Sequence, residues 1–523
     1  MAIASESTRQ ELPIILIRGF GGLDAADEKK QTYYGFNDGT VYPQRQGENY
    51  IYEGMVLKLM KSTWRYQDAT NVIGYYDKPG TPREILDELK GFPKEFFFGD
   101  KVVVDPAMAA ALRRNREPLR TLWVFRYYDL NDRSFAQYGV ALKRLIELVR
   151  TLVTKRTGAP LPKVNIIAHS MGGLIVREAI QVAYKPGEAE KAINKVVTLG
   201  TPHKGIVFQR LRSLKWLPFI DAGEEIERFN PDRQADPKNP AGYTNLAKAF
   251  PLDRLLTVVG TNYRTFGVGP ATLLNKLFSV DGEFGMNYNR SDGLVKIDSA
   301  QVPGAPRAYV HKCHGGEDSL ITSREAFEIA TRFFHGDIHA RLRLVDAQIS
   351  KGKDFLGKSE FFIGISLKPR GVDFELWHQS KAAENCYGPF NSDTLDDEKV
   401  AFDWIGADRK ERVLYEGWLD SGQSPVGRDD LVMRLETYVG ERDLFGVGFS
   451  DNIIHHDHCY IQARLKPTLR LAKHTGEKFI GAGQALTQTD DQTWLLPIEG
   501  PGFKATFGIQ LSFVPEVGAR VLV

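Results

Sequence analysis

One serine stands at the end of an apolar run, in the stretch IIAHSMGG that starts at Ile166. The residues two before and two after Ser170 are Ala168 and Gly172. Small residues are required there if a helix packs back on the preceding strand after a sharp turn. Glycine is usual at the first place, and alanine is a small departure that still fits. Ser170 could instead be a simple helix cap, but the strand before it and the amphipathic helix after it favour an exposed nucleophile.

A serine hydroxyl is a weak nucleophile that needs a neighbouring base, itself oriented by an acid. After a strand-to-helix turn of this kind, the acid and then the histidine follow in the chain. Asp292 in NRSDGLVKI and His314 in RAYVHKCHGG satisfy this order. Asp292 could also be an ordinary residue of a Ser-Asp-Gly turn. His311 is expected on a strand and could be a core histidine, so we favour His314, whose loop position gives it reach to the nucleophile.

Cleavage of an ester or amide by serine also needs two backbone N–H donors for the developing oxyanion. Met171, directly after the nucleophile, is the expected source of one. The glycine-rich stretch RGFGG, residues 18–22, follows an early strand, and Phe20 is the expected source of the other. The alternative is a glycine-rich turn without a further role. This chemistry requires no metal and no organic cofactor, and none is predicted.

The elements that must position these residues alternate between strand-like and helix-like patterns over the first 335 residues. Apolar runs typical of buried strands occur in LPIILIRG, TLWVFRYYD, KVNIIAHS, KVVTLGTPH and RLLTVVG. A helix is predicted from about residue 134 to 156, because its apolar residues recur at helical spacing. Repeated strand, helix and strand indicate a mostly parallel sheet covered by helices on both faces.

Two long stretches, about 24–119 and 205–250, interrupt this alternation and are predicted to be insertions over the edge of the sheet. The aromatic-rich first stretch and LRSLKWLPFI in the second could form either a mobile lid or a fixed cap. After about residue 338 the pattern changes to period two in TFGIQLSF, DLVMRLETYV and YIQARLK, which indicates an antiparallel, sandwich-like domain. The predicted domains are therefore 1–338 and 339–523.

Together these motifs resemble the lipase-like serine esterases of the α/β-hydrolase fold. The resemblance covers roughly residues 12–335 and rests on Arg18 to Gly22, His169 to Gly173, Gly200 to Gly205, Ser291 to Val295, and His314. Arg18 replaces a usual histidine and Ser291 a usual asparagine. The resemblance implies hydrolysis of carboxylic esters, with acyl lipids as substrates, through an acyl-enzyme. It leaves transient contact with a membrane surface open. The second domain matches no family that we can assign.

A histidine-rich stretch in the second domain, His455 to His458, suggests a metal site at first sight. On a strand, His456 and His458 share one face, and zinc binding would need further converging ligands. An ordinary solvated face explains the pair, so no metal is predicted. Cys313 lies beside His314 without a turn of the nucleophile type around it, and it is expected to be a packed residue at a strand end.

Composition narrows the remaining choices. The 523 residues include 68 Lys plus Arg and 66 Asp plus Glu, so no basic excess indicates a nucleic-acid partner. Three cysteines are too few for a disulfide framework. The apolar run near the N-terminus is only of strand length, and no segment reaches the roughly 18 apolar residues of a membrane span. We expect a cytoplasmic protein, although export without a signal would look the same; the oligomeric state stays open.

Two other functions stay open. An acyltransferase or amidase would use the same three side chains with a different acceptor or acyl donor. A binding protein with an inactive hydrolase domain belongs to another class, and the complete nucleophile, base and acid in the expected order argue against it.

Overall fold

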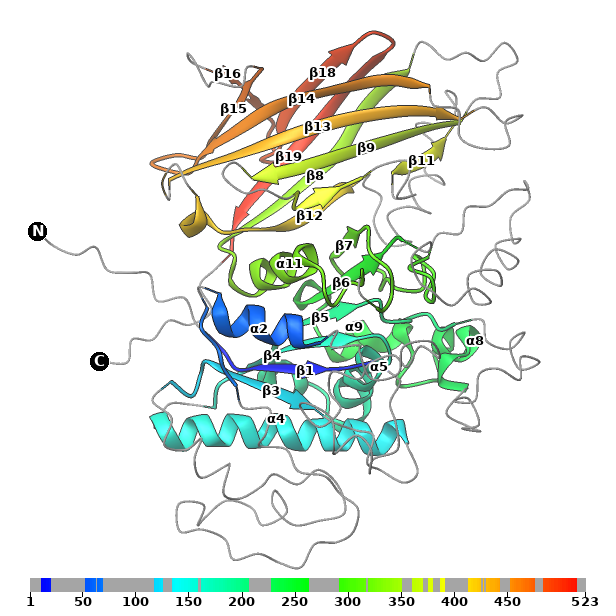
Figure 1. Ribbon diagram of the computed structural model, residues 1–523, viewed down its shortest axis with the longest axis vertical. Helices are drawn as coiled ribbons and strands as arrows, with labels where there is room; N and C mark the ends of the chain where they lie inside the picture. The colour runs from blue at the N-terminus through cyan, green and yellow to red at the C-terminus, as the bar shows by residue number, and fades with distance from the viewer. Residues whose placement is uncertain are drawn as a thin grey trace, which may run out of the picture. The chain divides into compact units, whose positions relative to one another are not determined.

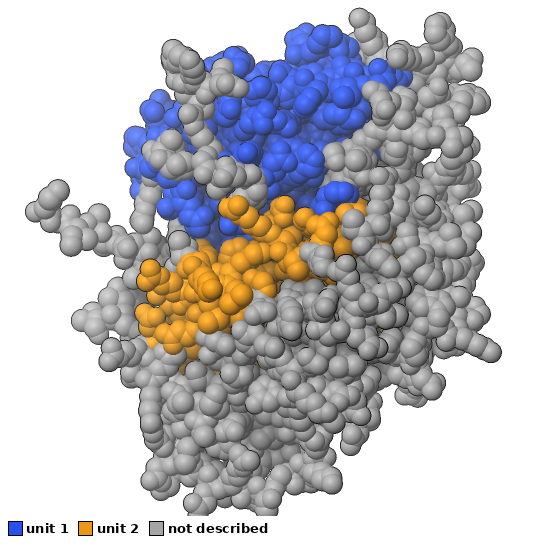
Figure 2. Space-filling model, in the orientation of Figure 1, with its two compact units in different colours: residues 1–10, 306–311, 328–523 blue, residues 11–305, 312–327 orange. Residues whose placement is uncertain are grey.

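The computed structural model divides into two compact units, which are coloured separately in Figure 2. The first, here called the α/β unit, comprises Glu11–Ala305 and Lys312–Phe327; the second, the β unit, comprises Met1–Gln10, Pro306–His311 and Glu328–Val523. The predicted boundary after residue 338 concerns independent folding and stays a prediction. The structure describes residues 11–19, 52–62, 64–68, 117–125, 134–158, 161–206, 227–262, 291–316, 318–349, 360–369, 375–379, 386–390, 413–424, 427, 429–442, 452–475 and 483–514.

A largely parallel sheet carries the first set of motifs. Its strands are β1 (Ile14–Ile17), β2 (Gln67–Asp68), β3 (Thr121–Phe125), β4 (Val164–His169), β5 (Ile193–Leu199), β6 (Leu255–Gly260) and β7 (Arg307–Val310). Their order is β2-β3-β1-β4-β5-β6-β7, and each neighbouring pair from β2 to β6 is parallel. Every residue of β1, β3, β4 and β6 is buried, as expected for strands covered on both faces.

Helices cover this sheet on both sides. The predicted helix is α4 (Phe135–Thr157), which ends at Gly158 in the left-handed conformation, and it packs with α5 (Met171–Glu178) in the core below the sheet. Figure 1 shows α2 (Glu53–Lys61) on the opposite side of β1 from α4. Strand order, parallel pairing and helices on both faces confirm the predicted α/β-hydrolase fold.

Further helices lie between α5 and β8 in the chain. They are the π-helical η5 (Ala179–Ala183), the α-helices α6 (Ala189–Ala192), α8 (Pro231–Ala235), α9 (Leu246–Ala249) and α11 (Arg324–His335), and the 3-10 helices η7 (Glu227–Phe229), η8 (Tyr243–Asn245) and η9 (Leu252–Arg254).

The two predicted insertions are described only in part. The first contributes α2 and the edge strand β2, so this piece extends the sheet as well as covering it. The second contributes the short helices from η7 to α9. The stretch LRSLKWLPFI lies outside the described residues, so a mobile lid stays a prediction.

The β unit contains two antiparallel sheets, as the period-two pattern predicted. One has the order β10-β9-β13-β14-β15-β16 with β11 beside β9, and the other has the order β12-β8-β19-β18-β17. Their strands are β8 (Ile338–Ile349), β9 (Glu360–Pro369), β10 (Trp377–His378), β11 (Tyr387–Phe390), β12 (Val413–Leu419), β13 (Asp430–Arg442), β14 (Ile453–Arg464), β15 (Arg470–His474), β16 (Gln484–Ala485), β17 (Thr487–Gln488), β18 (Trp494–Gly500) and β19 (Phe503–Phe513), with a 3-10 turn, η11 (Ser421–Gln423), after β12.

The two sheets of this unit share a core. The ring of His455 on β14 lies 4.9 Å, centroid to centroid, from the ring of Phe503 on β19. Phe507 and Ile509 are buried on the face that the alternation assigned to them, whereas Phe513, on the same face, is 56% exposed. Phe513 is the last residue of β19, where the strand reaches the end of the sheet.

Candidate active site

Ser170 lies at the turn between β4 and α5, with φ 51° and ψ −127°. A positive φ is strained for a residue with a side chain, and such strain is concentrated at functional turns. Small residues make the turn sterically feasible: a Cβ at Gly172 would lie 2.5 Å from the Arg18 carbonyl oxygen, and one at Gly173 would lie 2.2 Å from Thr201 Oγ1. Thr201 Oγ1 also donates to the Ser170 carbonyl oxygen at 2.8 Å. The turn is therefore held in place from several sides.

Three predicted side chains meet at this turn. His314 Nε2 lies 2.9 Å from Ser170 Oγ, and His314 Nδ1 lies 2.8 Å from Asp292 Oδ2. An ionised carboxylate only accepts hydrogen bonds, so Nδ1 carries the ring proton and Nε2 is left to accept from the serine hydroxyl. All three residues are buried, with 8% of Ser170 exposed. The arrangement can take a proton from Ser170.

Asp292 is fixed as an acceptor by its own turn. Its Oδ1 accepts the backbone N–H groups of Leu294 at 3.0 Å and Val295 at 2.7 Å, and its carbonyl oxygen accepts the His314 N–H at 2.8 Å. Asp292 is thus a turn residue and a partner of His314 at once, so the two sequence interpretations are compatible.

His311 takes no part in this arrangement. It follows β7 directly and is exposed, so the expectation of a core histidine on the strand is wrong. The ring next to Ser170 Oγ belongs to His314, three residues further on, because the intervening chain turns away from the strand.

Glycines at the ends of β5 and β6 make room for the acid and the base. Gly200 has φ +57°, and a Cβ there would lie 2.9 Å from Asp292 Oδ2 and 3.1 Å from His314 Nδ1. A Cβ at Gly260 would lie 2.6 Å from the Asp292 Cβ. The site therefore sits at the carboxyl ends of neighbouring parallel strands, where sites of α/β folds are built.

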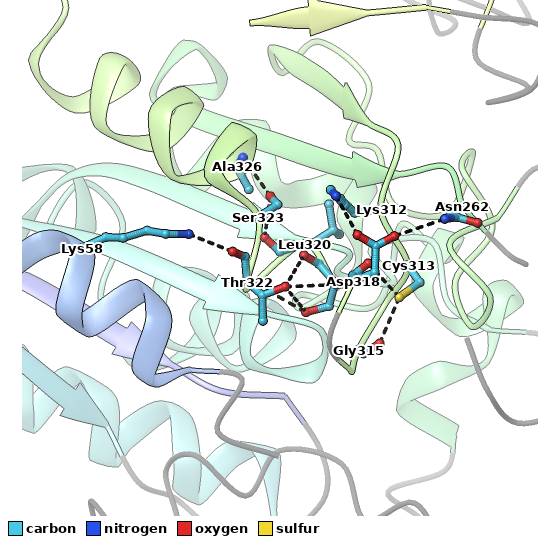
Figure 3. Close-up of polar contacts among 11 residues, drawn as sticks. Lys58, Asn262, Lys312, Cys313, Gly315, Asp318, Leu320, Thr322, Ser323 and Ala326 are labelled. Carbon is cyan, nitrogen blue, oxygen red and sulfur yellow. Dashed lines mark hydrogen bonds and ion pairs between the residues drawn. The ribbon is translucent and has the colours of Figure 1, made fainter. Parts of the chain in front are cut away.

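The loop that carries His314 closes on itself, as Figure 3 shows. The backbone N–H of Cys313 donates to the Asp318 carbonyl oxygen at 3.0 Å, and Lys312 Nζ pairs with Asp318 Oδ1 at 2.6 Å. The buried Cys313 thiol donates to the carbonyl oxygens of Gly315 and Asp318. Cys313 is therefore a packed residue at the base of the loop, as predicted.

The two expected oxyanion donors differ in what the structure describes. Met171 is the first residue of α5, and the first N–H groups of a helix have no acceptor within the helix. Phe20 lies outside the described residues, so its role stays a prediction. Gly19 before it is described: a Cβ there would lie 2.7 Å from the Ser170 Cβ, and its N–H donates to Tyr52 Oη at 2.8 Å. Gly19, at the start of the glycine-rich loop, thus lies directly against the nucleophile.

Two further polar residues at the site were not singled out by the sequence. Tyr52, just before α2, places its Oη 2.7 Å from Nδ1 of His169, the residue before the nucleophile. Burial raises the pKa of Tyr52 to about 12. Burial, and secondarily the neighbouring His314, hold the pKa of His169 well below its ordinary value. Both side chains are therefore neutral near pH 7.

The side chains of the histidine-rich stretch in the β unit do not point toward one common site. In β14, His455 points into the core and its Nε2 lies 3.0 Å from Thr437 Oγ1, whereas His456 is exposed. Across the described ranges, no three side chains of His, Cys, Asp or Glu are placed to hold a metal ion.

The strand order and the arrangement of Ser170, His314 and Asp292 at the carboxyl ends of the strands define a unit of the α/β-hydrolase fold. Residues 107–214 match the family model of the PGAP1-like alpha/beta domain. Among curated protein sequences, no relative matches the chain. Within the part of the chain that the structure describes, no helix combines the length and the apolar content needed to cross a membrane.

Several solved structures are similar at low identity. The mature form of the lipase BlEst2 of Bacillus licheniformis is 15% identical and covers 64% of this chain and 96% of its own, with a TM-score of 0.31. Phospholipase PlaB of Legionella pneumophila in complex with thio-NAD is 11% identical over 91% of this chain and 100% of its own, with a TM-score of 0.30. Lipase 1 of Pelosinus fermentans is 10% identical over 62% and 98%, with a TM-score of 0.28.

Proposed function

We propose that the protein is a serine hydrolase that cleaves carboxylic esters through an acyl-enzyme, with acyl lipids as its substrate class. The observation that supports this most is the placement of Ser170 Oγ and Asp292 Oδ2 on opposite ring nitrogens of His314. The lipase-like motifs of the sequence support an acyl lipid as the substrate, and the match of residues 107–214 to the PGAP1-like alpha/beta domain supports the fold that carries the nucleophile.

In the first half-reaction, Ser170 Oγ attacks the ester carbonyl carbon and His314 Nε2 takes the hydroxyl proton. Asp292 keeps the ring oriented and stabilises the imidazolium. The carbonyl oxygen becomes an oxyanion, for which we assign the backbone N–H groups of Met171 and Phe20 as donors. The tetrahedral intermediate collapses, the ester C–O bond breaks, and the imidazolium gives its proton to the leaving alcohol.

In the second half-reaction, water replaces the alcohol. His314 takes one proton from the water as its oxygen bonds to the acyl carbon, and a second oxyanion forms at the same donors. When this intermediate collapses, the bond to Ser170 Oγ breaks and the serine recovers its proton from the imidazolium. The products are one carboxylic acid and one alcohol, and the enzyme is unchanged.

Steady-state hydrolysis of p-nitrophenyl esters of increasing chain length tests this proposal. Ser170→Ala should lower kcat about 10⁴-fold or more. The matched control is Ser366→Ala, which also removes a buried hydroxyl next to a histidine, at 2.7 Å from His378 Nδ1, and should leave kcat unchanged.

The outcomes separate the competing functions. Turnover that appears only when an alcohol or amine acceptor is added would replace hydrolysis with acyl transfer. Cleavage of anilides in preference to esters would indicate an amidase. If the folded wild-type protein neither turns over these substrates nor reacts with a phosphonate, the remaining hypothesis is a binding protein with an inactive hydrolase domain.

A further inference from the structure

A chain of hydrogen bonds connects the glycine-rich loop to the loop of His314. The Gly19 N–H lies 2.8 Å from Tyr52 Oη, Tyr52 Oη lies 2.7 Å from His169 Nδ1, and His169 Nε2 lies 2.9 Å from the His314 carbonyl oxygen. Tyr52 and His169 are both 3% exposed. Neither contacts the reacting atoms in the proposed mechanism.

The direction of each bond follows from the chemistry of its ends. A carbonyl oxygen only accepts, so His169 Nε2 carries the proton and donates it to His314. In the neutral ring, His169 Nδ1 must then accept, and the Tyr52 hydroxyl donates to it. The oxygen of Tyr52 is left to accept the N–H of Gly19. Each hydrogen bond in the chain therefore has only one possible direction.

This chain of hydrogen bonds begins next to Phe20, the predicted oxyanion donor of the glycine-rich loop. The Gly19 N–H is engaged by Tyr52, so it is not the amide that faces an oxyanion, and the next amide in the chain belongs to Phe20. Gly19 packs against Ser170, so the bond from its N–H to Tyr52 fixes the start of the glycine-rich loop beside the nucleophile. Catalytic groups lose efficiency when they are displaced by about 0.5–1 Å, so such a restraint matters at this place.

The helix that follows Tyr52, α2, contacts the loop of His314 as well. Lys58, in the last turn of α2, donates from Nζ to the Thr322 carbonyl oxygen at 2.7 Å, a contact that Figure 3 shows. Thr322 closes the loop that begins at Cys313. Tyr52 before α2 and Lys58 in its last turn therefore contact both loops that meet at Ser170.

We propose that Tyr52 and His169 are positioning residues that hold Gly19, at the start of the glycine-rich loop, and the backbone of His314 in place beside Ser170. This inference rests on the proposed function. The raised pKa of Tyr52, about 12, and the lowered pKa of His169 agree with it, because both groups keep one protonation state over the working range of an esterase.

Tyr52→Phe tests the relay, since it removes one hydroxyl and keeps the ring. We expect kcat for ester hydrolysis to fall on the order of tenfold to a hundredfold while KM stays within about twofold, because orientation and not substrate binding is lost. Tyr66→Phe is the matched control: Tyr66 is 2% exposed and donates one bond to the Leu12 carbonyl oxygen at 3.0 Å. It should leave kcat within about twofold. Equal kcat values for the two variants would overturn the proposal.

A second measurement does not depend on activity or on the folding of a variant. Nitrogen NMR of protein labelled with ¹⁵N-histidine should show His169 as the neutral Nε2–H tautomer with a hydrogen-bonded Nδ1. A cationic ring, or the Nδ1–H tautomer, would overturn the relay. If the wild-type protein neither hydrolyses esters nor reacts with a phosphonate, the proposed function fails, and the NMR result still decides whether the relay exists.

Discussion

A serine, a histidine and a carboxylate lie within hydrogen-bonding distance in each of the two units. In the α/β unit, His314 uses Nε2 toward Ser170 and Nδ1 toward Asp292. In the β unit, His378 uses Nδ1 toward both partners, at 2.7 Å from Ser366 Oγ and 2.6 Å from Glu375 Oε2.

The difference decides what each group can do. A ring nitrogen that donates its proton to a carboxylate cannot also take the proton of a serine, so the second cluster has no base for its hydroxyl. The backbone differs as well: Ser170 stands at a strained turn at the end of a strand, whereas Ser366 lies inside β9. Residue types alone do not make a nucleophile. The serine and the carboxylate must lie on opposite ring nitrogens, and the serine must stand at a strained turn.

The largest expected effect comes from removing the base. His314→Ala should lower kcat for ester hydrolysis about 10⁴-fold or more, because Ser170 then has no proton acceptor. His378→Ala in the β unit and His311→Ala should retain most of the activity. A loss with His311→Ala and not with His314→Ala would show that the wrong imidazole is assigned.

Adding a methyl group beside Asp292 and His314 should have the next largest effect on kcat. Gly200→Ala puts a Cβ within contact distance of Asp292 and His314, so we expect kcat to fall about tenfold or more. Gly158→Ala is the control: Gly158 has a similar φ of +68° and nothing within 4 Å of the added Cβ. Both variants should lose about 1 kcal/mol of unfolding free energy to backbone strain. Similar kcat values would contradict the close packing around the pair.

Acid should affect the α/β unit and the His378–Glu375 pair of the β unit in opposite directions. Burial holds the pKa values of His169 and His203 well below the ordinary 6.5. Below about pH 6.5 the unfolded chain therefore binds protons that the folded α/β unit does not. Its unfolding free energy should fall as pH falls, by about 1.4 kcal/mol per pH unit for each histidine.

The contribution of the His378–Glu375 pair to the unfolding free energy has the opposite pH dependence. The hydrogen bond between them raises the pKa of His378 and lowers that of Glu375. Its contribution is present below the ordinary histidine value and is lost as pH rises through the raised one. The pair is partly exposed, so this contribution is below about 1 kcal/mol. Hydrogen exchange of peptides from β4 and β5 against peptides from β9 and β10, at pH 5.5 and 7.5, measures both contributions. Equal pH dependence would contradict the assignment.

The smallest effect is expected at the histidine-rich strand. His456→Ala and His458→Ala should change the unfolding free energy by less than about 0.5 kcal/mol and leave kcat unchanged, because the two side chains do not converge with other ligands. Zinc titration by calorimetry checks this. A stoichiometric zinc site that is lost in both variants would contradict the placement of these side chains.

The sequence predicts Ser170, Asp292 and His314 as one group because each has a local signal, and the structure brings the three side chains together. Ser170 is flanked by small residues that only a tight turn requires, and Asp292 and His314 follow in the order that the fold imposes. The parallel sheet is equally local, since each buried strand is a continuous apolar run. The exposure of Phe513 at the end of β19 has no local signal, because the alternating pattern does not reveal where the neighbouring sheet ends.

Tyr52 could not be predicted in the same way. It is one aromatic residue among many in the first insertion, and it lies 33 residues from Gly19 and 117 from His169 in the chain. No spacing rule joins three such distant residues, and only the packing of α2 brings them together. The same limit applies to Gly200, whose clash partners come from two later segments.

The most direct test of the account is the site of covalent labelling by a fluorophosphonate, located by peptide mass spectrometry. We expect one adduct per chain, on Ser170, which is absent after Ser170→Ala and after unfolding. An adduct on Ser366 or another serine, or a folded protein that takes up no label, would contradict the assignment of Ser170 as an activated nucleophile.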